Sequence, residues 1–176
     1  MNKLRIINSI KTCKASTGLM LVALMTCHTA AADSAFKLTA IADDAKGQYV
    51  VDGDYNTAIE KIEGQGVKRF ASETNLCVAY TVSGDDAAAK GACDNALTLI
   101  VEGKDNRDVR VYGNYRRSLA LALSNRGVFR ALTGDLQGAK LDLTRAVELH
   151  STLRQAKFNL LRLEEKVGGL KTVAAS

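Results

Sequence analysis

The sequence contains no proline and no tryptophan, and aromatic residues make up only 5% of its 176 positions. Because proline breaks or kinks helices, its absence favours a chain built largely of helices. The scarcity of aromatic residues indicates that these helices pack through small and aliphatic side chains. The chain is long enough to form one domain with a buried core.

Residues that commonly carry out catalysis are also scarce. The only histidines are His28 and His150, and there is neither a glycine-rich phosphate loop nor a Gly-x-Ser-x-Gly turn. Adjacent carboxylates such as Asp85 and Asp86 point to different faces of a helix, which favours caps and solvated charge. We predict that the protein is not an enzyme and binds no metal or cofactor, and that His150 caps a helix end.

The first 32 residues have the order of a secretory signal. Basic residues come first, the apolar run 18–27 follows, and Ala30-x-Ala32 supplies a cleavage pattern. The apolar run is about ten residues long, whereas a membrane-spanning helix needs about 20. We predict cleavage near Ala32/Asp33, a mature domain at 33–176 without stable membrane insertion, and a periplasmic or secreted location. An uncleaved anchor and a lipid on Cys27 remain alternatives.

The charge distribution changes once this segment is set aside. It holds four of the 24 basic residues and no acidic residue, so 20 bases remain against 19 acids. A nearly neutral mature chain argues against nucleic acid as a partner. Residues 33–100 carry a net charge of −5 and residues 101–176 a net charge of +6. This asymmetry leaves head-to-tail association into a homo-oligomer open.

Two of the four cysteines, Cys13 and Cys27, lie in the predicted signal, so Cys77 and Cys93 remain. An even pair in an exported chain indicates one disulfide. A redox or metal-binding pair is the alternative, but the chain has no Cys-x-x-Cys and too few histidines to support it.

A Gly-Asp turn recurs at 53–54, 84–85 and 134–135, each time before an alanine-rich amphipathic run. Glycine ends one helix in a left-handed conformation, and aspartate caps the next by accepting hydrogen bonds from free amides. The small residues that follow let two helices approach closely. This chemistry predicts antiparallel helical hairpins.

The pattern resembles the tetratricopeptide repeat, a helix–turn–helix unit of 34 residues. The last hairpin matches best, with Gly127, Gly134, Ala139 and Ala146 at positions where the family has small residues or its turn. The resemblance implies an all-α fold, an α-solenoid of antiparallel hairpins at about 36–64, 70–101 and 109–150, followed by a capping helix at about 153–167.

Spacing departs from the family between the second and third turns. They are 50 residues apart, an excess of 16 over one repeat, and the excess falls around 104–119. We interpret it as a polar loop followed by a lengthened helix. The family positions of Cys77 and Cys93 face the seam between two helices, which places them within reach of each other.

The resemblance also implies a binding surface on the concave face. Asn75, Asn125 and Asn159 recur at the same repeat position, where some family members use asparagines to hold the backbone of an extended peptide. Hydrogen bonding within the array is the alternative. Neighbouring candidates are an apolar floor of Val78, Val82, Val128 and Leu132 and a basic pair, Arg116 and Arg117.

Two further arginines, Arg126 and Arg130, allow two interpretations. They either bind an acidic segment or pair internally with Asp142 or Glu148, and we favour internal pairing. Taken together, the sequence predicts an exported adaptor or scaffold that binds a peptide or partner protein on its concave face. The alternative is a structural protein that assembles through its acidic and basic halves.

Overall fold

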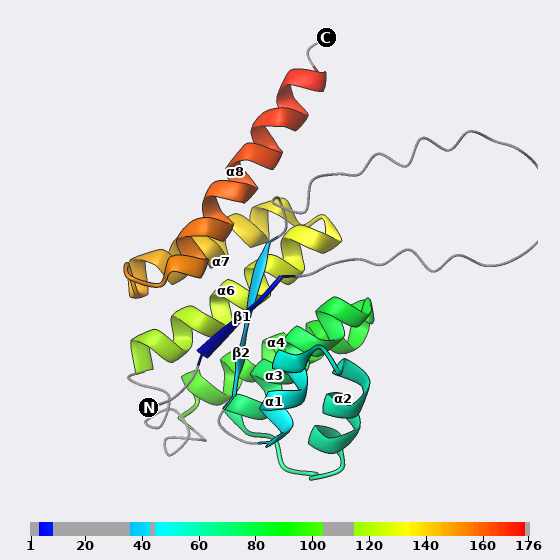
Figure 1. The fold of residues 1–176 in the computed structure, drawn as a ribbon. Coiled ribbons are helices and arrows are strands. Elements are labelled where there is room, and N and C mark those ends of the chain that lie inside the picture. The colour runs from blue at the N-terminus through cyan, green and yellow to red at the C-terminus, as the bar shows by residue number, and fades with distance from the viewer. Residues whose placement is uncertain (1–3, 9–35, 43–44, 104–114, 175–176) are drawn as a thin grey trace, which may run out of the picture.

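The computed structural model describes residues 4–8, 36–42, 45–103 and 115–174, and these are mostly helical (Figure 1). The helices are α1 (Ala45–Asp52), α2 (Tyr55–Glu63), α3 (Phe70–Ser83), α4 (Asp86–Val101), α6 (Tyr115–Thr133), α7 (Leu136–Leu149) and α8 (Arg154–Ala174). Two strands, β1 (Leu4–Asn8) and β2 (Lys37–Ile41), pair antiparallel.

The three Gly-Asp turns join consecutive helices as the sequence predicts. Each glycine has a positive φ, which a residue with a side chain rarely adopts. Each aspartate accepts a hydrogen bond from the backbone amide three residues ahead, at the start of the next helix. The φ values are 84° at Gly53, 80° at Gly84 and 95° at Gly134, and the caps are Asp54, Asp85 and Asp135.

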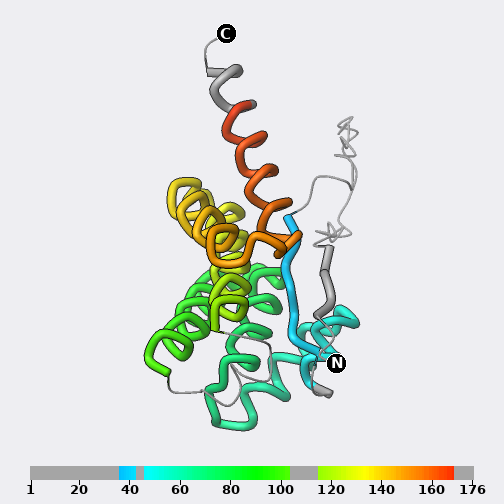
Figure 2. Tube along the Cα trace, turned by 90° about the vertical axis from the view of Figure 1, so that its left-hand side faces the viewer, coloured from blue at the N-terminus to red at the C-terminus, as the bar shows by residue number. Residues whose placement is uncertain are grey.

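The helices form two layers, and β2 lies against one of them. The helices that contact β2 are α1, α3, α6 and α8, which alternate along the chain with α2, α4 and α7. Figure 2 shows β2 running from α8 at one end of the molecule towards α1 at the other. We call the β2-bearing side the ladder face.

Small residues bring paired helices close together. A Cβ added to Gly127 of α6 would lie 2.8 Å from Cγ of Leu143 in α7, so a side chain there would force the helices apart. Alanines take the equivalent role elsewhere and are fully or almost fully buried. They are Ala89, Ala96, Ala139 and Ala146.

Cys77 of α3 and Cys93 of α4 form a disulfide, as predicted, with Cα atoms 4.7 Å apart. Both residues are 1% exposed and pack with Ile62, Leu76 and Phe129. The bond therefore fixes two helices of one pair through their buried seam.

The first predicted hairpin begins later than expected. Residues 37–41 form a strand, and the helical pair starts at Ala45, because the main-chain groups of the strand bond to side chains from distant helices. The last helix runs from Arg154 to Ala174, beyond the predicted end at 167.

Other predicted features lie outside the described residues. The apolar part of the signal, its cleavage site and residues 104–114 of the 16-residue excess are among them. The lengthened helix after that excess is α6, which ends at Thr133. Within the described part of the chain, each helix is too short or too polar to cross a membrane.

Reducing the Cys77–Cys93 bond should lower the free energy of unfolding by about 3 kcal/mol. The reason is that the unfolded chain gains conformational entropy when the loop between two cysteines 16 residues apart is no longer closed. Urea unfolding with and without reductant measures the change. A Cys77→Ala/Cys93→Ala chain is the control and should not respond to reductant. Equal midpoints for the oxidised and reduced wild-type chain would contradict this role.

Candidate functional site

The most organised polar feature is a row of three buried asparagines on the ladder face. Asn75 lies on α3, Asn125 on α6 and Asn159 on α8, with exposed fractions of 3%, 1% and 0%. Buried amides need hydrogen-bond partners for both their oxygen and their nitrogen. These partners are the main-chain groups of β2.

Each asparagine binds both main-chain groups of one strand residue. The Oδ1 atom accepts a hydrogen bond from the N–H, and Nδ2 donates one to the C=O of the same residue. The pairs are Asn159 with Lys37 (2.7 and 2.8 Å), Asn125 with Thr39 (2.9 and 2.9 Å), and Asn75 with Ile41 (2.8 and 2.9 Å).

This regular arrangement follows from strand geometry. Alternate residues of a strand direct their main-chain groups to the same edge. One asparagine from each of three helices therefore meets every second residue of β2. We call these paired contacts the asparagine ladder. These hydrogen bonds involve only main-chain atoms of the strand, so the ladder does not require particular side chains in the segment that it holds.

Apolar contacts hold the strand as well. Leu38 and Ala40 are fully buried and belong to one cluster with Val78 of α3 and Val128 of α6. Val82, which is partly buried, packs against the same cluster. These three valines are the ones predicted to form an apolar floor, and in the structure the floor is covered by β2.

Leu132 does not join this floor. Its side chain is 39% exposed because it lies in the last turn of α6, before Gly134, outside the buried clusters. Arg116 is exposed and donates from Nε to the carbonyl of Leu149 at 3.3 Å. Arg117 is half-buried on the same helix. Neither arginine is part of the ladder.

The segment that the ladder holds in this structure is the chain's own β2. Asn75, Asn125 and Asn159 were predicted to bind a partner, with hydrogen bonding inside the protein as the alternative, and here their amides bond to Ile41, Thr39 and Lys37. A partner reaches these amides only when β2 leaves. With β2 in place, a partner on this face meets the strand.

Sequence reasoning missed Gly47, which lets α1 meet the end of the strand. A Cβ at this position would lie 1.9 Å from the carbonyl oxygen of Ile41 and 2.9 Å from Nδ2 of Asn75. A side chain at position 47 would therefore displace the paired contact between Asn75 and Ile41. A glycine inside a helical run was the available signal, because glycine destabilises helix interiors unless close packing requires it.

Arg126 and Arg130 pair internally, as favoured from the sequence. Arg126 forms a bidentate salt bridge with Asp142, with both hydrogen bonds 2.8 Å long, and Arg130 donates to the same carboxylate at 2.9 Å. The other predicted acid, Glu148, pairs with Arg145 instead. The buried Asp142 thus ties α7 to α6.

A second carboxylate, Asp94 of α4, extends this network, bonding Arg126 at 2.9 Å and Lys90 at 3.0 Å. Burial alone would raise the pKa of Asp94, but hydrogen bonds and charge from Arg126 and Lys90 outweigh it and hold the pKa below its usual value. The network therefore stabilises the charged carboxylate and links three helices.

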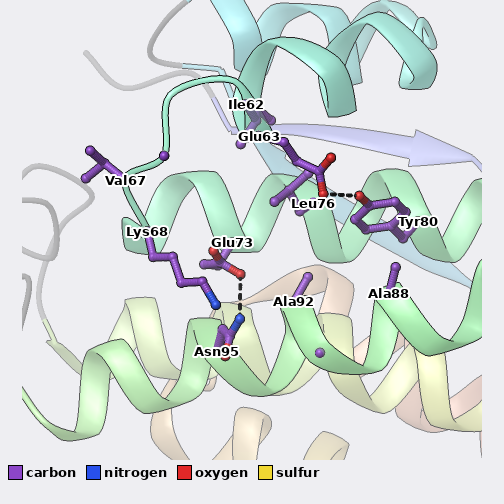
Figure 3. Close-up of a pocket in the computed structure, with 12 residues that line it drawn as sticks. Ile62, Glu63, Val67, Lys68, Glu73, Leu76, Tyr80, Ala88, Ala92 and Asn95 are labelled. Carbon is purple, nitrogen blue, oxygen red and sulfur yellow. Dashed lines mark hydrogen bonds between the residues drawn. The ribbon is translucent and has the colours of Figure 1, made fainter.

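A cavity of about 400 Å³ opens on the other side of α3, between α2 and α4 (Figure 3). Tyr80 donates to Glu63 at 2.5 Å, and Asn95 donates to Glu73 at 3.0 Å. Burial, the bond to Glu63 and nearby carboxylates raise the pKa of Tyr80, so its phenol stays protonated. These contacts join α2 to α3 and α3 to α4.

His150 was predicted to cap a helix end. His150 ends α7, where its N–H bonds to the carbonyl of Ala146 and its ring contacts Thr152. Across the described residues, no group of three or more His, Cys, Asp or Glu side chains is arranged to hold a metal ion.

Replacing Asn125 by alanine should lower the free energy of unfolding by about 2–4 kcal/mol, because the N–H and C=O of Thr39 would stay buried without partners. Chemical denaturation of the wild type and the variant measures this change in unfolding free energy. Asn56→Ala, at an exposed position of α2, is the matched control and should change stability by less than about 0.5 kcal/mol. Similar losses for both variants would show that the ladder contributes little.

The stabilisation from Asp94 should disappear in acid. Its pKa is lower in the folded than in the unfolded chain, so its contribution is present above about pH 4 and is lost as pH falls through the folded pKa. The difference in unfolding free energy between wild type and Asp94→Asn should therefore shrink from pH 7 to pH 3. A difference that stays constant across that range would contradict the assignment.

Comparison with known proteins returned no relative: no protein-family model, curated protein or solved structure matches this chain. A functional assignment therefore has to come from the geometry of the ladder face and from the chemistry of the sequence.

Proposed function

We propose that the protein is an exported interaction module of the tetratricopeptide type, whose ladder face receives an extended segment of a partner protein. In this interpretation the helices form a short α-solenoid of three hairpins, and the ladder face is its concave side. The protein acts as an adaptor or scaffold and carries out no reaction of its own.

The order of elements supports the solenoid. The pairs α1–α2, α3–α4 and α6–α7 are each joined by the same Gly-Asp turn, and α8 follows without a second helix. In a solenoid each unit packs on its neighbours, and the last one needs a cap to cover its apolar side. Leu163 of α8 supports a capping role, because it is 1% exposed and belongs to the same cluster as Leu143 of α7 and Val128 of α6.

The observation that carries the function is the asparagine ladder. Three helices each supply one amide, and together they hold an extended backbone through its N–H and C=O groups alone. Main-chain recognition of this kind is how sequence-tolerant peptide-binding surfaces work. The ladder face is thus already organised to hold one extended segment, its own β2, and a partner's segment would add beside that strand.

Export is supported by the signal-like order of residues 1–32 and by the buried disulfide. Disulfides persist in oxidising compartments such as the periplasm and the cell exterior and are rare in the cytosol. We therefore place the working protein there, cleaved near Asp33.

Self-assembly through oppositely charged halves has less support. Asp94 belongs to the acidic half and Arg126 to the basic half, and they bond to each other inside one molecule at 2.9 Å. Arg130 is likewise used internally, by Asp142. Part of the charge that would drive head-to-tail contacts is thus already neutralised.

Site-specific photo-crosslinking tests the proposal. A photoreactive residue replaces Lys37, whose half-buried side chain lies on the ladder face, or Leu141 of α7, which is 72% exposed in the other layer. In an export-competent bacterial host, position 37 should capture a discrete partner and position 141 should not. Mass spectrometry identifies the partner and also reads the N-terminus, expected near Asp33.

Capture from position 141 alone, or from neither position, would argue against binding at the ladder face. A recovered chain that still begins at Met1 would argue against processing while leaving the binding result intact.

A further inference from the structure

β2 has two edges, and only one of them faces the asparagines. Lys37, Thr39 and Ile41 direct their main-chain groups to the ladder. Because directions alternate along a strand, Leu38 and Ala40 direct theirs to the opposite edge. We call this the outer edge of β2.

The outer edge is covered by β1. The two strands pair antiparallel over five residues, with Leu4 opposite Ile41 and Asn8 opposite Lys37. This register puts Ile7 opposite Leu38 and Arg5 opposite Ala40, the positions at which an antiparallel pair exchanges hydrogen bonds. β1 also contacts α1, so the added strand lies beside both β2 and a helix.

β1 belongs to the segment that the sequence marks as a removable signal. If residues 1–32 leave, the main-chain groups of Leu38 and Ala40 lose their partners, although their side chains are fixed in the core. Unpaired main-chain groups along a strand edge pair readily with another extended chain. The edge is therefore covered in the precursor and open in the processed protein.

The open edge is also rigid. The ladder holds β2 from one side, Leu38 and Ala40 anchor it in a core cluster, and Gly47 lets α1 close over its end. An incoming strand therefore loses only its own conformational freedom on binding, because the template is already ordered.

We infer that the outer edge of β2 is a strand-addition site that takes an extended, proline-free segment of a partner protein in antiparallel register. Leu4–Asn8 occupies the site until it is removed. The inference rests on the proposed function and specifies its geometry: the partner pairs with β2 and does not replace it on the asparagines. Processing of the leader then controls when binding begins.

The test uses full-length chains and a labelled peptide with the sequence of residues 2–10. In an Arg5→Pro/Ile7→Pro chain, β1 lacks the two amide donors that face β2, so the edge is open. Arg5→Ala/Ile7→Val retains both donors and is the matched control. Fluorescence polarisation should show at least tenfold tighter binding to the proline variant than to the control, with equal helicity by circular dichroism.

Backbone N-methylation of the peptide locates the contact. Methyl groups at the positions of Arg5 and Ile7 should abolish binding, whereas methyl groups at Leu4 and Ile6, whose amides point away from β2, should leave most of it. If binding is lost instead with methyl groups at Leu4 and Ile6, the peptide has replaced β2 on the asparagines. That result, or equal binding of the peptide to the proline variant and its control, overturns strand addition. Crosslinking from position 37 tests binding at the ladder face separately.

Discussion

The pairing of three asparagine amides with the main chain of β2 is the constraint on which the rest of this structure depends. It fixes a strand among helices, because asparagine side chains satisfy the N–H and C=O groups along one of its edges. It also requires α3, α6 and α8 to present one residue each in line. The alternation of helices between two layers is what produces that line.

Close packing of helices makes the alignment accurate. Glycine or alanine at the contact points sets short distances between paired helices, and Gly127 against Leu143 leaves no room for a larger residue. The disulfide and the Asp142 network fix the same pairs by different chemistry. A rigid frame matters here because an amide displaced by about 1 Å loses its hydrogen bonds to the strand.

Much of this could be predicted because the relevant chemistry is local. Glycine and aspartate specify turns and caps within a few residues, and the Cys77–Cys93 pair lies within one helical pair. The positions of Asn75, Asn125 and Asn159 could also be predicted, but their occupant could not, because Lys37 and Asn159 are 122 residues apart. The Ile41 carbonyl lies against Gly47, six residues further on, but the strand that puts it there depends on distant asparagines.

The separation between the strand and its asparagines has a consequence for synthesis. β2 leaves the ribosome before any helix that will hold it, and the last amide it needs, Asn159, follows 122 residues later. Contacts this distant in sequence form late, since the intervening chain must first be ordered. The nascent protein therefore carries an apolar segment without the asparagines that will hold it through most of its elongation, and this interval is when it is most exposed to misassociation.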